Sequence, residues 1–212
     1  MNRLKVSYSE DFNVDDFQNK SWKKSDEIYL RKYWSGDLAD NERHAEARIV
    51  WTANALFVRF QGIQKEPLIV NLNPQLAEKT MSLWERDVFE IFVAPDFKNP
   101  KSYLEFEVAP TGEWLEAKID ILPDGTRRTD FQFDSKMTSA VKVLEDKILA
   151  IIKIDWQAFG KKPQTGDLWR GNLFRCIGQG ANRGYLTWQP TKTPTPNFHV
   201  PEAFGEFKFV KN

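Results

Sequence analysis

The chain has few of the residues on which metal centres and disulfide frameworks depend. Among its 212 residues Cys176 is the single cysteine, and there are two histidines. One cysteine excludes an intrachain disulfide and a cysteine-based metal cluster. Two histidines leave few nitrogen ligands for a metal. We therefore expect no metal site built from these residue types.

An excess of charge of either sign is also absent. Lys+Arg and Asp+Glu both number 30, which gives a formal net charge of zero. Electrostatic binding to nucleic acid needs a basic surface, and an anionic membrane attracts the same kind of surface. Neither nucleic acid nor an anionic membrane is therefore an expected partner.

Long apolar runs are missing as well. No stretch approaches the roughly 20 apolar residues of a membrane span, and residues 1–6 lack the apolar run of a signal peptide. Membrane insertion is not expected. The sequence as given indicates a cytoplasmic protein, or a secreted or periplasmic one from which a signal was removed.

Helical periodicity is scarce, and alternation of apolar and polar residues dominates. Short alternating runs pair across turn residues, as at 48–51 with 56–60 and at 141–144 with 148–154. Many short strands with turns about every 8–12 residues are typical of a sandwich or barrel. The pattern predicts one all-β domain, residues 1–212, folded as an antiparallel β-sandwich of immunoglobulin or jelly-roll type. It allows a short helix at 74–80 and one turn at 156–160.

One predicted central strand, residues 87–93, carries a carboxylate on an apolar face. Alternation places Glu90 with Val88 and Phe92. A buried carboxylate is costly unless it is paired and hydrogen-bonded. Arg175 interrupts another apolar run and is the best candidate partner, either in a structural ion pair or beside a ligand.

Other candidate binding residues are aromatic or polar side chains in loops and on strand faces. Trp84 precedes the Glu90 strand and either caps the core or offers its ring face to a ligand. Phe198 and His199 follow a proline-rich loop, which keeps a ring rigid. Glu105 and Glu107 share a strand face that is expected to be solvated, and they can accept hydrogen bonds if that face is concave.

Three segments in order resemble the signatures of family 9 carbohydrate-binding modules. The first is the hairpin at 47–60. The second is the motif Trp-x-x-Asp-x-x-Glu-Ile-Phe at 84–92, and the third runs from Thr187-Trp188 to Phe204-Gly205. The resemblance implies non-catalytic sugar binding, with a mono-, oligo- or polysaccharide as ligand and a glycoside hydrolase as the protein partner to consider. It also implies a cleft at one end of the sandwich where two aromatic rings enclose the sugar.

Carried over by position, the resemblance makes Trp84 the first ring and Phe198 the second, with Glu90 as a hydroxyl-binding glutamate. Glu107 stands where the family has a sugar-binding arginine, and Arg175 where it has a glutamine. We interpret the two substitutions as a relocated positive charge. The expected ligand-binding set is therefore Trp84, Glu90, Glu107, Arg175, Phe198 and His199, with no catalytic residue.

Some family members bind structural calcium in acidic loops. The corresponding residues here, 96–102, are poor in oxygen ligands, whereas calcium takes about 6–8 of them. We expect no calcium at this loop and no cofactor.

Three alternatives remain open. A glycosidase would use paired carboxylates such as Glu90 and Glu107. A haem-binding electron-transfer domain would need axial ligands from His44, His199, Met81 and Met137. A protein-interaction module with a vestigial sugar site is the third.

Overall fold

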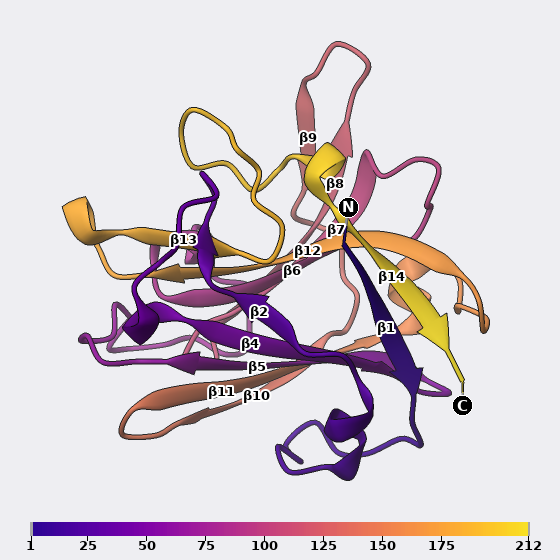
Figure 1. The fold of residues 1–212 in the computed structure, drawn as a ribbon, viewed down its shortest axis with the longest axis horizontal. Helices are drawn as coiled ribbons and strands as arrows, with labels where there is room; N and C mark the ends of the chain where they lie inside the picture. The colour runs from indigo at the N-terminus through magenta and orange to yellow at the C-terminus, as the bar shows by residue number, and fades with distance from the viewer. Residues whose placement is uncertain (1, 212) are drawn as a thin grey trace.

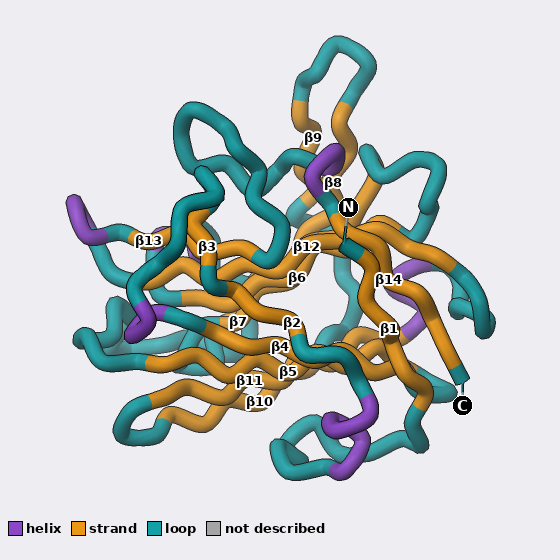
Figure 2. Tube along the Cα trace, in the orientation of Figure 1, coloured by secondary structure: helices purple, strands orange, loops and turns teal. Residues whose placement is uncertain are grey.

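The computed structural model describes residues 2–211 as strands joined by loops and short 3-10 turns (Figure 2). The strands are β1 (Arg3–Tyr8), β2 (Ile28–Leu30), β3 (Lys32–Tyr33), β4 (Ala45–Trp51), β5 (Ala55–Ile63), β6 (Val88–Ala94), β7 (Ser102–Val108), β8 (Trp114–Ile121), β9 (Arg127–Asp130), β10 (Thr138–Val143), β11 (Lys147–Asp155), β12 (Leu168–Ile177), β13 (Gly184–Thr187) and β14 (Gly205–Val210). The 3-10 turns are η1 (Lys20–Lys24), η2 (Asn41–Arg43), η3 (Leu83–Glu85), η4 (Trp156–Phe159), η5 (Gly180–Asn182) and η6 (Pro201–Ala203). The predicted all-β fold is confirmed.

The strands form one curled sheet that folds into two layers (Figure 1). The main strand order is β10-β11-β5-β4-β1-β14-β12-β6-β7-β8-β9, with β2 beside β4 and β13 beside β12 and β3. Strand β1 runs parallel to both β14 and β4, whereas the other pairings are antiparallel. The sheet is therefore mixed, and β1 and β14 join one layer to the other.

The central core lies between the two layers. Phe60 of β5 stacks on Phe89 of β6 with ring centroids 5.0 Å apart. Ile152 of β11 and Phe106 of β7 belong to the same buried cluster. Because side chains alternate along a strand, the neighbours of Phe89 and Phe106 point to the other face of their layer.

That other face carries a second buried cluster. It includes Val88 and Phe92 of β6, Phe174 of β12 and Phe204. Loops and the β8–β9 hairpin cover this face instead of a second layer of strands, so it has room for a cavity.

Most local predictions hold. The two hairpins drawn from alternation are β4–β5 and β10–β11, and the turn at 156–160 is η4. The short helix expected at 74–80 is wrong. There the Trp114 indole donates to the carbonyl of Leu76, and the amide of Thr80 donates to the carbonyl of Trp114. These bonds hold the segment as a loop against β8.

Within residues 2–211, the structure contains no helix with the length and apolar character that crossing a bilayer requires.

Candidate functional site

A cavity of about 230 Å³ lies on the loop-covered face of the β12–β6–β7 layer. Its residues come from η3, β6, β7, β9, β12 and β13, from the residue that follows β9 and from the loop before η6. They are Trp84, Glu90, Glu105, Arg127, Thr129, Phe131, Cys176, Tyr185, Pro196, Asn197, Phe198 and His199. Segments far apart in the sequence thus meet at one place, because residues 84, 127, 129, 131, 185 and 196–199 all line this cavity.

Trp84 is the most available aromatic ring of the cavity. It stands in η3 and is 38% exposed. Ser82 starts this turn with φ 58°, a left-handed conformation that bends the chain out of the preceding loop. Arg183 donates to the carbonyls of Trp84 and Arg86 and fixes the turn. The indole is therefore held in place with part of its surface facing solvent.

Phe198 lies in the cavity wall but is only 9% exposed. Its ring stacks on Phe174 with centroids 4.0 Å apart and an interplanar angle of 12°. Tyr185 approaches it edge-on at 6.0 Å. One face of Phe198 is thus occupied by the protein, and the half-buried rings of Tyr185 and Phe131 add aromatic surface to the same cavity.

His199 is fixed by a hydrogen bond between its Nδ1 and the Tyr103 hydroxyl, 2.9 Å long. Burial, assisted by the charge of Arg127, lowers the pKa of His199 to about 3. Burial, with the Glu105 carboxylate, raises the pKa of Tyr103, so its hydroxyl keeps its proton and can donate to Nδ1. In this tautomer the imidazole is neutral and offers Nε2–H as a donor.

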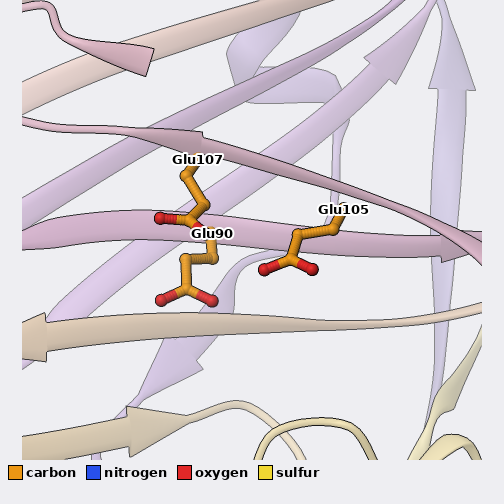
Figure 3. Close-up of side chains that lie close together, drawn as sticks. All are labelled: Glu90, Glu105 and Glu107. Carbon is orange, nitrogen blue, oxygen red and sulfur yellow. The ribbon is translucent and has the colours of Figure 1, made fainter. Parts of the chain in front are cut away.

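Three carboxylates, here called the acidic cluster, gather at the base of the cavity. Glu90 of β6 pairs directly with Glu107 of β7, and Glu105 follows two residues away on the same face. One carboxylate oxygen from each lies within 4.8 Å of the others. Figure 3 shows the three side chains converging. Their exposures are 1%, 5% and 0% for Glu90, Glu105 and Glu107.

Burial raises the pKa of every member of the acidic cluster. For Glu90 and Glu107, repulsion from neighbouring carboxylates adds to this effect. The Cys176 thiol donates to Glu90 Oε1 at 3.3 Å. No donor in the described part of the chain bonds to either oxygen of Glu107. A bond between Glu107 and Glu105 requires a proton on one of the two.

Arg175 lies elsewhere. Opposite residues of an antiparallel pair share a sheet face. Phe174 is opposite Glu90, and Arg175 is opposite Phe89. Its guanidinium donates to the carbonyl of Arg43 at 2.9 Å and to Gln64 Oε1 at 2.7 Å, on the central-core side. The predicted Glu90–Arg175 pair is therefore wrong, and so is the interpretation of Arg175 as a positive charge relocated to the site.

The cavity's cation is instead Arg127 of β9. No sequence pattern identifies Arg127 as a site residue, because it lies in an exposed hairpin and only the folding of the chain brings β9 over β7. The expectation of a solvated face for Glu105 and Glu107 is also wrong, because loops cover that face. Of the expected binding residues, Trp84, Glu90, Phe198 and His199 line the cavity, Glu107 lies beside Glu90, and Arg175 is remote.

Comparisons with known proteins agree with this architecture. The family model described as "Carbohydrate family 9 binding domain-like" matches residues 14–212. A family 9 carbohydrate-binding module from Caldicellulosiruptor kristjanssonii, solved in complex with cellotriose, has a TM-score of 0.70 and 20% identity, covering 100% of this chain and 95% of that chain. A structure of a family 9 module from the same organism with glucose has a TM-score of 0.66 and 20% identity, covering 100% and 97%.

Among curated proteins, an extracellular protein of Arthroderma benhamiae is 21% identical and is matched over 77% of both chains. Because the two solved modules are 20% identical to this chain, their structural likeness shows the fold.

Proposed function

The chain belongs to the carbohydrate family 9 binding domain-like family, and from this premise we propose that its sugar site is the cavity beside Trp84. The protein is a non-catalytic carbohydrate-binding module. The observation that supports this location is the meeting of a fixed, partly exposed indole with buried polar groups in one cavity.

The size of the cavity favours one sugar ring inside it. Pockets for drug-sized ligands occupy roughly 300–1,000 Å³, whereas this one has about 230 Å³. A longer chain would therefore insert one terminal residue and leave the rest outside. This geometry supports recognition of a chain end or of a free mono- or disaccharide.

The walls suit the two kinds of surface that a pyranose presents. Its C–H face packs on aromatic rings, which contribute about 0.5–1.5 kcal/mol beyond area burial. Trp84 supplies the open ring, while Phe198 contributes a smaller surface because Phe174 covers one face of it. Sugar hydroxyls can donate to Glu90 and Glu105 and accept from His199.

The carboxylates do not favour the glycosidase alternative. A pair of catalytic carboxylates flanks the scissile bond, about 5–5.5 Å or 6.5–9.5 Å apart. Glu90, Glu105 and Glu107 instead lie side by side on one face of one sheet. Arg175 does not pair with Glu90, but the arrangement offers no carboxylate on the opposite side of a bound ring.

We expect modest affinity. At about −0.3 kcal/mol per heavy atom, the roughly two dozen atoms of a disaccharide give about −7 kcal/mol, or a Kd near ~10 μM. One ring of about half that size falls in the millimolar range by the same arithmetic.

The test is a tryptophan-fluorescence titration against a panel of mono- and disaccharides. Trp84→Ala should weaken binding roughly tenfold or more. Tyr29→Ala is the matched control, because Tyr29 is 39% exposed and lies on β2, away from the cavity. An unchanged curve for Trp84→Ala, or a flat response of the parent protein to the whole panel, would contradict the proposal.

A further inference from the structure

The acidic cluster places three carboxyl groups together without a cationic partner. None of the ion pairs in the described part of the chain includes Glu90, Glu105 or Glu107. Arg127 lines the same cavity but forms no ion pair with them. Carboxylates buried at this density need protons or a cation, because isolated buried charges are very costly.

Glu107 is the carboxylate that most clearly needs a proton or a cation. It has no exposed surface, and neither of its oxygens receives a hydrogen bond from a donor in residues 2–211. Nearby Glu116 on β8 is equally buried, yet it accepts bonds from Ser135 and lies 3.6 Å from Lys79 Nζ. Glu107 is therefore a buried acceptor directed into a cluster that lacks a donor.

The spacing of the oxygens matches that of ligands around one ion. Calcium–oxygen distances are about 2.3–2.6 Å, so two oxygens on one ion lie at most about 5 Å apart. The three carboxylates meet this limit, since their nearest oxygens lie within 4.8 Å of one another. They offer up to six oxygens, close to the 6–8 that calcium takes. Cys176 holds Glu90 by its bond to Oε1.

We propose that Glu90, Glu105 and Glu107 bind one divalent cation, calcium by preference, at the base of the cavity. Glu90 and Glu105 line the cavity, so the ion enters through it and has its open coordination positions on that side. This site is distinct from loop 96–102, where Asp96 Oδ1 accepts the amide of Lys98.

The ion also bears on sugar recognition, and this step rests on the proposed function. Calcium takes neutral oxygen ligands along with carboxylates, so two neighbouring sugar hydroxyls can complete its coordination. The preferred ligand class is then a sugar ring with a vicinal pair of hydroxyls that reaches the base of the cavity. Chelation should weaken its binding at least tenfold.

The test is a calorimetric titration of chelator-treated protein with calcium in the absence of sugar. We expect one equivalent to bind, and binding at least tenfold weaker in Glu107→Gln. Glu116→Gln, the matched buried carboxylate, should bind like the parent protein. Glu105→Gln, the most exposed member of the cluster, is the second variant if Glu107→Gln does not fold.

Thermal unfolding provides a second readout. Calcium should raise the Tm of the parent protein and of Glu116→Gln, and leave that of Glu107→Gln unchanged. The proposal is overturned if calcium, magnesium and manganese all fail to bind at millimolar concentration, or if Glu107→Gln binds calcium equally well. Because no sugar is present, a failure of the sugar site does not affect this result. If sugar binding persists unchanged in chelator, only the proposed coordination of the ion by sugar hydroxyls is contradicted, and the ion site itself is not.

Discussion

The two faces of the β6–β12 pair treat buried charge in opposite ways. On the central-core face, Arg175, Gln64 and Asp87 form what we call the arginine network. Arg175 donates to Gln64, and Asp87 accepts the amides of Gly178 and Ile69. On the cavity face, Glu90 receives one thiol hydrogen bond and Glu107 none from a donor in residues 2–211.

The difference separates polar groups that stabilise the fold from polar groups that are free to bind a ligand. In the arginine network every charged side chain has partners within the chain, and Gly62 leaves room for it. A Cβ at Gly62 would lie 2.7 Å from Arg175 Cζ. Buried polar groups are normally satisfied, so Glu107, whose two oxygens both lack a partner in residues 2–211, is explained by a ligand. Burial alone does not distinguish the two, whereas the hydrogen-bond partners do.

The largest effect should come from breaking the arginine network. Arg175→Met leaves the carbonyls of Arg43 and His44 and the Gln64 side chain without their donor. Each buried unsatisfied group costs about 1–3 kcal/mol, so we expect the free energy of unfolding to fall by about 3 kcal/mol in urea titrations. Arg128→Met, in an exposed pair with Asp120, should change it by less than about 0.5 kcal/mol. Similar values for the two variants would contradict the comparison.

The second effect is a dependence of stability on pH in the presence of chelator. Burial, with repulsion from Glu105, raises the pKa of Glu90 from 4.5 to about 8. Burial raises the pKa of Glu105 to about 7. Between these values and 4.5 the folded state holds more protons than the unfolded state, so stability falls as pH rises. His199, whose pKa is lowered to about 3, acts oppositely and only below its ordinary value of 6.5.

In the window from pH 6.5 to 8 the acidic cluster titrates together with Asp87, whose pKa burial also raises, and the Glu90→Gln variant separates the two contributions. Burial raises the pKa values of Cys176 and Tyr103, so they keep their protons. We expect a loss of roughly 1–2 kcal/mol across this window, measured by thermal unfolding. The loss should be smaller in Glu90→Gln, and a flat profile for the parent protein would show that the cluster is not buried as described.

The smallest effect concerns the hydrogen-bonded pair of Tyr103 and His199 on the cavity face. Tyr103→Phe removes the hydroxyl that bonds His199 Nδ1. A net hydrogen bond contributes about 0.5–1.5 kcal/mol, so stability should fall by about 1 kcal/mol. The pKa of His199 should stay low, because burial and the charge of Arg127, which lower it, are left in place. Urea titrations measure the loss of stability, and an unchanged free energy of unfolding would contradict this prediction.

Alternation and turn residues predicted the β4–β5 and β10–β11 hairpins and the strand that carries Glu90, because these are local properties, but they did not predict β1, β2, β3, β9 or β13. They also predicted that Glu90 is buried. The partner was wrong, because Arg175 is displaced by one residue from the position opposite Glu90, and one residue reverses the face. The helix at 74–80 was wrong because Trp114, distant in sequence, provides the bonds that hold that segment as a loop.

The cavity itself depends on what covers the sheet. Alternation predicts that Glu105 and Glu107 share a face, but it does not indicate whether loops cover that face. The covering comes from residues 196–199 and from β9, which carries Arg127. Their positions follow from the curl of the whole sheet, so the sequence pattern could identify Trp84 and Glu90 but not Arg127 or Tyr185.

The most direct test of the account is a calorimetric titration of Glu90→Gln and Glu116→Gln with the tightest sugar from the panel. Both glutamates are fully buried on neighbouring parts of the same layer, and only Glu90 lines the cavity. We predict that Glu90→Gln weakens sugar binding tenfold or more, while Glu116→Gln stays within about twofold of the parent protein. Equal affinities for the two variants would contradict the claim that buried carboxylates without a cationic partner mark the ligand site.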